Sequence, residues 1–248
     1  MVAVSIISHG HGKMVVELVS RLLTFPEVAE IIVTKNISEE LLFPVSPRVL
    51  IIENKIPKGF GQNHNFAFVK SGQKYFCPLN PDIKLPSNPF PRLIVALKDF
   101  DAALVAPLVI NNKGDIEDSA RYFPTLYSLW KKLIFKTQGR YMKKKGDPIF
   151  FPEWIAGMFM LFESTAYRKI NGFDKKYYLY YEDVDICMRL WQFGYSMIVD
   201  PSVCIIHDAR RSSRANYTYM KWHLKSMAIY FLHHCGRHPK VKVLNNKE

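Results

Sequence analysis

Short apolar runs alternate with amphipathic stretches through the first hundred residues. The run at 2–8 is rich in β-branched residues, which predicts a strand buried on both faces. Further strands are predicted at 31–33, 49–52, 74–79 and 102–106. Apolar residues at helical spacing predict helices over 14–22, 62–71 and 88–98. This alternation predicts an open α/β sheet, mixed but mostly parallel, flanked by helices.

The pattern changes after residue 109. Residues 110–150 form a basic, aromatic segment that interrupts the alternation. Order resumes in "EWIAGMFMLF", where a strand is predicted after Gly157, and a helix follows over 164–170. We then expect a helix over 182–193, two short extended pieces broken at Pro201, and a helix over 216–234.

Composition is consistent with one large globular domain. The chain has 248 residues, of which 48% are hydrophobic, enough for a substantial core. The four cysteines form no CxxC pair, which argues against a zinc site of that type and indicates reduced, mostly buried thiols. The first apolar run lacks a preceding basic region, so we interpret it as a strand and not as a signal peptide. No uninterrupted apolar run approaches the roughly 18 residues that span a bilayer.

The net charge of +12 predicts an anionic partner: nucleic acid, anionic lipid or a phosphorylated small molecule. Lysine and arginine concentrate in 131–145 and again in 208–248. Leucines, tyrosines and a tryptophan accompany them in 126–150, and no recognised nucleic-acid motif is present. This combination favours an anionic membrane surface over nucleic acid. For the C-terminal helix, ordinary packing on the domain is the alternative.

Polar or glycine-rich segments follow the predicted strands. They are "SHGHG" at 8–12, "KGFGQNHN" at 58–65 and "NPDIKL" at 80–85. In open α/β sheets, ligands bind at the carboxyl ends of strands. Asp82, on a turn after Pro81, is suited to holding a divalent cation against a phosphate; a local Asx turn is the alternative.

The segment "YLYYEDVD" at 178–185 places three acids at the start of a predicted helix. Asp185 lies one turn before Arg189 and is expected to pair with it. The apolar stripe of the helix is expected to be core; it contains Val184, Cys187, Met188 and Trp191. A role at the start of the helix explains the presence of Asp183 least well among the three acids, because Asp183 borders this apolar stripe. A carboxylate between an apolar face and a cleft is a candidate general base.

Together, these motifs resemble bacterial glycosyltransferases of family 2, most closely the rhamnosyltransferases of O-antigen and related polysaccharide assembly. The resemblance rests on "KGFGQNHN", "LNPDIKL", "WIAGMFML", "NGFDKKYYLYYEDVDICMRLWQFGY" and "VDPSVCIIHDARRS", and it extends from residue 2 to about residue 232. It implies a GT-A (Rossmann-like) nucleotide-sugar-binding fold. It also implies metal-assisted, inverting transfer by a single displacement.

The resemblance also implies roles for individual residues. Asp183 corresponds to the catalytic base, and Asp82 and His207 correspond to ligands of Mg²⁺ or Mn²⁺ at the donor diphosphate. From its residues alone, a lone histidine such as His207 is more often a hydrogen-bonded residue at the edge of the core than a ligand. The implied donor-binding residues are Ser8, His9, Gly10, Asn36, Gly59, Phe60, Gly61, Asn63, Asn65 and Asn80. The implied acceptor-binding residues are Trp154, Gly157, Tyr181 and Glu182.

The expected organisation is a GT-A catalytic domain over 1–215 and a basic amphipathic helix and tail over 216–248. Within the domain we expect a nucleotide-sugar-binding half (1–109), the basic and aromatic insertion (110–150) and an acceptor-binding half (151–215). The implied reaction moves L-rhamnose from dTDP-β-L-rhamnose to a polyprenyl-diphosphate-linked saccharide in O-antigen (lipopolysaccharide) synthesis. The expected location is cytoplasmic, peripheral on the inner face of the bacterial inner membrane.

One departure from the family pattern keeps alternatives open. Many members carry "DN.S" after the second strand, whereas this chain has Lys35 in the Asp position and retains Asn36 and Ser38. A UDP-sugar donor (galactofuranose, glucose or N-acetylhexosamine) and an inactive scaffold homologue are therefore alternatives to the rhamnosyl assignment.

Overall fold

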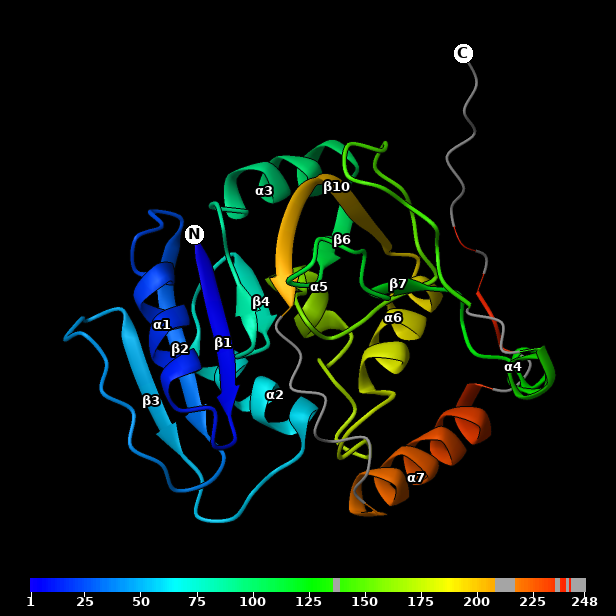
Figure 1. The fold of residues 1–248 in the computed structure, drawn as a ribbon, viewed down its shortest axis with the longest axis horizontal. Coiled ribbons are helices and arrows are strands. Elements are labelled where there is room, and N and C mark those ends of the chain that lie inside the picture. The colour runs from blue at the N-terminus through cyan, green and yellow to red at the C-terminus, as the bar shows by residue number, and fades with distance from the viewer. Residues whose placement is uncertain (136–138, 208–216, 235–236, 240, 242–248) are drawn as a thin grey trace.

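The computed structural model describes residues 1–135, 139–207, 217–234, 237–239 and 241. Its centre is an eight-stranded sheet in the order β3-β2-β1-β4-β9-β6-β10-β5 (Figure 1). The strands are β1 Val2–Ser8, β2 Val28–Lys35, β3 Val49–Glu53, β4 Tyr75–Leu79, β5 Ile83–Lys84, β6 Ala102–Ile110, β9 Leu161–Glu163 and β10 Ser196–His207. A separate two-stranded sheet pairs β7 Ala120–Arg121 with β8 Trp154–Ile155. The helices are α1 Lys13–Leu22, α2 Phe60–Lys70, α3 Phe90–Asp99, α4 Leu126–Phe135, α5 Ser164–Lys169, α6 Glu182–Gln192 and α7 Tyr217–His234.

Most strand pairs in the large sheet are parallel. β1 runs parallel to both β2 and β4, β2 to β3, and β6 to β10. β9 lies antiparallel between β4 and β6 and joins the two halves, and β5 is antiparallel to β10 at the edge. The predicted mixed, mostly parallel α/β sheet is confirmed.

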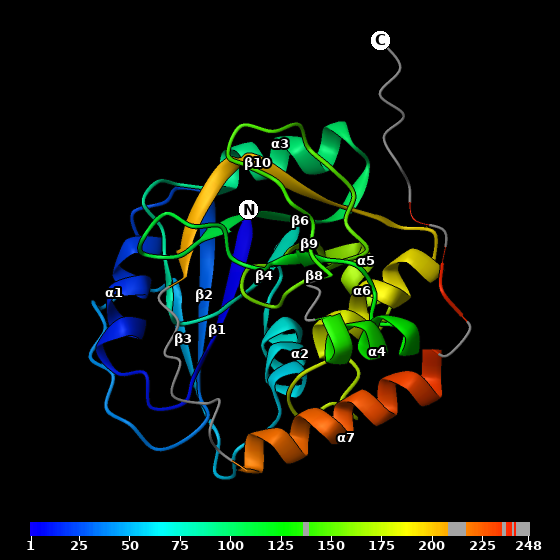
Figure 2. The same cartoon turned by 45° about the vertical axis from the view of Figure 1, so that its right-hand side comes forward.

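The sheet is covered on both faces, which explains why its strands are apolar on both sides. Alternate residues of β1 belong to different cores: Val4 packs with α1 and α3, and Ala3 packs with α2, α5 and α6. α7 lies outside α6 and contributes Tyr230 to the second core (Figure 2). Each predicted helix in 1–109 and 164–193 is present, because each has an apolar stripe that matches one sheet face.

One prediction of local structure is wrong. The extended segment around Pro201 is one strand, β10, with a register shift against β6 between Asp200 and Cys204. Pro201 cannot donate a ladder hydrogen bond, and the sheet accommodates it as an irregularity without ending the strand. The predicted strand after Gly157 is confirmed as β9, which enters the large sheet; β8 lies before Gly157 and pairs with β7.

Candidate active site

A cavity of about 540 Å³ opens at the carboxyl ends of the parallel strands. Its wall combines the segments after β1, β2 and β4 with the first turns of α2 and α6. It therefore lies where the strand-end rule places a ligand. Of the predicted donor-binding residues, His9, Asn36, Phe60, Asn63 and Asn80 line it. We call it the first cavity.

An asparagine network forms one side of the first cavity. Asn54 donates to the side-chain oxygens of Asn36 (2.9 Å) and Asn63 (2.7 Å). Asn36 also accepts from the backbone N–H of Lys58 (2.8 Å) and donates to its carbonyl (3.0 Å). These bonds fix the wall before any ligand arrives. Sequence reasoning missed Asn54, although it directly follows β3 and the strand-end rule could have found it.

The remaining predicted donor-binding residues do not line the first cavity; they are Ser8, Gly10, Gly59, Gly61 and Asn65. Gly59 and Gly61 instead permit close packing, since added Cβ atoms would lie 2.7 Å from the Tyr178 carbonyl oxygen and 2.5 Å from Phe173 Cβ, respectively. The side chain of Asn65 accepts from the backbone N–H of Phe173 (3.0 Å) and donates to its carbonyl (2.8 Å). These three residues position the loop before α6, and a direct role in donor binding stays a prediction.

Gly10 contributes through its backbone. It has a left-handed φ of +74°, and its N–H and that of Gly12 each donate to a Glu39 carboxylate oxygen at 3.1 Å. Burial raises the pKa of Glu39, but hydrogen bonds and the charge of His11 outweigh burial and lower it overall. An ionised Glu39 therefore holds the loop that carries His9.

Asp183 occupies the first turn of α6, where two backbone groups hold its carboxylate. Oδ2 accepts from the Gly157 N–H (3.1 Å) and Oδ1 from the Val184 N–H (2.8 Å). Burial raises the pKa of Asp183, and these hydrogen bonds only partly oppose the rise. Tyr180 and Tyr181 just before it have φ of 69° and 65°, a left-handed conformation that non-glycine residues rarely adopt.

Asp183 lies on the wall between two cavities. A second cavity of about 490 Å³ shares Tyr180, Glu182 and Asp183 with the first. Of the predicted acceptor-binding residues, Trp154, Tyr181 and Glu182 line this second cavity. Gly157 lines the first cavity and contacts the second only through its hydrogen bond to Asp183. The predicted base thus faces two compartments.

Glu182 is buried beside Asp183, and its Oε2 has no hydrogen-bond partner. Burial, followed by the neighbouring Asp183 charge, holds the pKa of Glu182 well above its usual range. Glu182 therefore keeps its proton to a higher pH than an ordinary glutamate does.

Asp82 and His207, 125 residues apart, meet beside the first cavity, where His207 Nε2 lies 3.2 Å from Asp82 Oδ2. His207 Nδ1 lies 3.3 Å from Glu117 Oε2, a contact that the sequence did not predict. Burial lowers the pKa of His207, but both carboxylates outweigh it, so the pKa is raised. Asp82 Oδ1 is buried without a partner.

We tested whether these residues fit a divalent cation. Within the described residues, no group of three or more His, Cys, Asp or Glu side chains has an arrangement that could hold a metal. Mg²⁺ and Mn²⁺ sites often use one or two protein ligands and take the others from phosphate and water. The unpartnered Asp82 oxygen and His207 fit such a site, in which the donor diphosphate completes the coordination.

Lys35 forms an ion pair with Glu53, with Nζ 2.7 Å from Oε1. The pair borders a hollow of about 360 Å³ that adjoins the first cavity at Asn36. Lys35 therefore stands at the end of β2 beside the first cavity without lining it.

The fold matches solved glycosyltransferases. GalNAc-T7 with UDP, GalNAc and Mn²⁺ superposes with a TM-score of 0.66 at 14% identity, covering 93% of this chain and 48% of that chain. The mannosyltransferase PcManGT from Pyrobaculum calidifontis, in complex with GDP-Man and Mn²⁺, gives 0.63 at 13% identity, covering 96% and 65%. The protein has the GT-A fold.

The amino-acid sequence of this GT-A protein is also similar to those of glycosyltransferases. It is 29% identical over 245 residues to the rhamnosyltransferase WbbL of Escherichia coli K12, covering 93% of this chain and 92% of that protein. It is 27% identical over 163 residues to the Mycobacterium tuberculosis N-acetylglucosaminyl-diphospho-decaprenol L-rhamnosyltransferase, covering 61% of this chain and only 52% of that protein. A family model described as the N-terminal domain of galactosyltransferase matches residues 141–215. The resemblance to glycosyltransferases, including rhamnosyltransferases, is confirmed.

Proposed function

We propose that the protein is an inverting glycosyltransferase that moves a sugar from a nucleotide diphosphate to an acceptor hydroxyl. The observation that carries the proposal is the place of Asp183, held by two backbone N–H groups on the wall shared by two cavities. A donor in the first cavity and an acceptor in the second would both reach this carboxylate.

In the proposed reaction Asp183 takes the proton of the acceptor hydroxyl as that oxygen attacks the anomeric carbon. A base with a raised pKa accepts a proton more strongly, provided that it is ionised at the working pH. The N–H groups of Gly157 and Val184 orient the carboxylate, and the burial that raises the pKa of Glu182 disfavours a second negative charge beside it. One base suffices for a single displacement, which forms no covalent intermediate with the protein. The configuration at the anomeric carbon therefore inverts.

Asp82 and His207 would hold Mg²⁺ or Mn²⁺ beside the first cavity. The bound cation would supply stabilisation of the charge that develops on the departing nucleotide diphosphate. The unpartnered, buried Asp82 Oδ1 supports this proposal, as do the Mn²⁺ ions in the two superposed structures.

We propose L-rhamnose, supplied as dTDP-β-L-rhamnose, as the transferred sugar and a polyprenyl-diphosphate-linked saccharide as the acceptor. The names of the Escherichia coli and Mycobacterium tuberculosis relatives support rhamnose as the sugar, and the second name supports a polyprenyl-diphosphate-linked acceptor. A UDP-sugar donor is the second candidate, favoured by the departure at Lys35. The product would serve cell-surface polysaccharide such as O-antigen.

We further propose peripheral attachment to an anionic membrane, on the cytoplasmic face of the inner membrane. Exposed apolar and aromatic side chains lie on α4 (Leu126, Tyr127, Trp130) and α7 (Tyr217, Met220, Leu224, Leu232). Lys131, Lys221 and Lys225 accompany them. None of the helices in the described part of the chain is long and apolar enough to cross a bilayer. Flotation with anionic vesicles at moderate salt tests this attachment, and protein that stays at the bottom of the gradient would contradict it.

Asp183→Asn tests the proposed function. The amide keeps an oxygen for the Val184 N–H but turns an NH₂ group towards the Gly157 N–H, and it cannot take a proton. We expect kcat to fall by roughly 10²–10⁴ with dTDP-rhamnose and a divalent cation. The half-buried Asp174→Asn, with a similar charge change outside both cavities, is the matched control. A panel of UDP-sugars in the same assay decides the donor, and unaltered turnover in Asp183→Asn would remove Asp183 as the base.

A further inference from the structure

Two cationic side chains line the second cavity, and none of the sequence motifs gives either of them a role. Arg121 lies on β7, directly opposite Trp154 of β8, and Lys131 lies on α4. Both side chains line the cavity that also contains Asp183. A cavity with two cations and a buried base has a charge pattern suited to a ligand with one hydroxyl to activate and one anionic group.

Both cations are held over aromatic rings. The Arg121 guanidinium carbon is 5.4 Å from the Trp154 ring centre, and Lys131 Nζ is 4.7 Å from the Tyr127 ring centre. Asp118 Oδ1 lies 3.3 Å from Arg121 Nε, an ion pair that uses one of the five N–H donors of the guanidinium. Lys131 is three residues after Ser128, whose hydroxyl and N–H form reciprocal bonds with Thr125 that define the start of α4.

The aromatic walls and the surroundings of the cavity are suited to a glycolipid. Trp154, Tyr122 and Tyr127 line the cavity and provide flat, apolar surfaces on which a sugar ring can be buried. α4 and α7 both contribute to the wall, and both carry the exposed apolar side chains described above. A lipid tail leaving the cavity between them would pass directly to the proposed membrane surface.

We infer that the second cavity binds the acceptor, and that Arg121 and Lys131 bind the diphosphate that links its sugar to the lipid. The inference rests on the proposed function. Burial raises the pKa of Asp183, and Arg121 lies close enough for its charge to oppose part of that rise. The diphosphate would therefore lie next to the sugar whose hydroxyl meets the base, while the two cations offset its repulsion from Asp183.

The test measures acceptor binding directly, by the fluorescence of the protein's tryptophans, with Trp154 in the cavity wall. The probes are farnesyl-diphosphate-linked N-acetylglucosamine and the neutral octyl N-acetylglucosaminide, both in neutral detergent micelles. We expect Arg121→Gln and Lys131→Gln each to raise the Kd for the diphosphate probe about tenfold, equivalent to about 1.4 kcal/mol. The Kd for the neutral probe should change less than about twofold, a difference of about 0.4 kcal/mol.

Matched variants separate charge recognition from structural damage. Arg121→Lys and Lys131→Arg should retain most of the affinity for the diphosphate probe, because each keeps its charge. Lys98→Gln, an exposed change on α3 that lines neither cavity, should leave both probes unaffected. Equal weakening of both probes, or no weakening of either, would overturn the inference.

Two further arms distinguish the sources of failure. If the losses appear only with anionic vesicles and not in neutral micelles, the two cations serve the membrane surface and the inference is wrong. Transfer from dTDP-rhamnose is measured separately. Preferential weakening of the diphosphate probe in a protein without transfer would support the site while contradicting the proposed function. If the wild type transfers the sugar but both variants bind the diphosphate probe as tightly as the wild type, the proposed function is supported and the inferred diphosphate site is wrong.

Discussion

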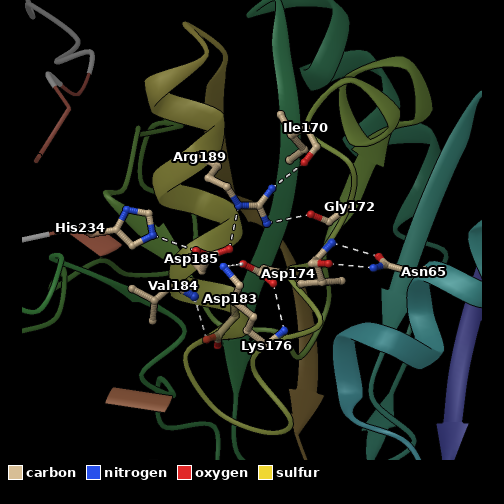
Figure 3. A network of polar contacts seen from close by, with 11 residues as sticks. Asn65, Ile170, Gly172, Asp174, Lys176, Asp183, Val184, Asp185, Arg189 and His234 are labelled. Atoms are coloured by element: carbon tan, nitrogen blue, oxygen red, sulfur yellow. Dashed lines mark hydrogen bonds and ion pairs between the residues drawn. The ribbon is translucent and has the colours of Figure 1, made fainter. Parts of the chain in front are cut away.

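Arg189 and Asp185 of α6 together link this helix to the turn after α5 and to α7 (Figure 3). Its Nε donates to Asp185 Oδ2, and its two terminal nitrogens donate to the carbonyls of Ile170 and Gly172, each bond 2.7 Å long. His234, at the end of α7, lies 2.8 Å from the other Asp185 oxygen. The network therefore connects α6 to the turn after α5 and to α7, two of the segments that hold the cavity walls.

Arg189→Met should lower the free energy of unfolding by about 3–5 kcal/mol, the usual cost of breaking a buried ion pair. The magnitude follows from burial: Asp185 is 2% exposed and would lose its main counter-charge. Each lost bond to a charged group contributes roughly 1.5–3 kcal/mol, and part is recovered where water reaches the two carbonyls. Urea unfolding, with an unchanged m-value, measures the loss.

A double variant separates the lost pair from the stranded charge. Asp185→Leu combined with Arg189→Met leaves no uncompensated carboxylate, so the double variant should be more stable than the sum of the single changes predicts. A loss below about 1 kcal/mol in Arg189→Met, or strict additivity in the double variant, would refute the reasoning.

The same pair makes the free energy of unfolding depend on pH in the acid range. Burial raises the pKa of Asp185, but hydrogen bonds and charges from His234 and Arg189 outweigh it, so the folded-state pKa is lowered. A lowered pKa stabilises the fold above the unfolded value and loses that contribution as pH falls towards the folded value. Removing Arg189 should therefore make the acid limb shallower.

Three other predictions concern the cavity walls. Gly61→Ala should destabilise by about 1–3 kcal/mol in thermal unfolding, because its Cβ meets Phe173 at 2.5 Å, whereas Gly72→Ala has open space and should not. Glu182→Gln should be more stable than the wild type at about pH 8 and equal at about pH 4. Because the pKa of Glu182 is raised in the folded state, its contribution to the free energy of unfolding is complete below the unfolded-state pKa and is lost as pH rises through the folded-state pKa. Urea midpoints that are the same for the variant and the wild type at both pH values would contradict this. Asp82→Asn should weaken Mn²⁺ binding in the presence of a nucleotide diphosphate, measured by calorimetry, while EDTA should abolish transfer by the wild type; undiminished binding would remove Asp82 as a ligand.

Local features were predictable from the sequence, because they depend on residues close together in the chain. The pairing of Asp185 with Arg189, one turn apart, is confirmed at 2.7 Å. The predicted core stripe of α6 is confirmed, since Val184, Cys187, Met188 and Trp191 are buried. Periodicity reports which face of an element is apolar, and the strand-end rule then indicates where a ligand can bind.

Only the tertiary structure decided which residues of distant segments meet. Asp82 lies on the turn after β4 and His207 at the end of β10, and no spacing in the sequence brings Glu117 to the same histidine. Periodicity could not reveal that Asp183 separates two cavities or that Arg121 lines one of them, because those facts depend on how β7, β8 and α7 pack around α6. The sequence by itself determined the elements and their apolar faces, through short-range periodicity. The cavities between those elements exist only once packing has placed segments more than a hundred residues apart side by side.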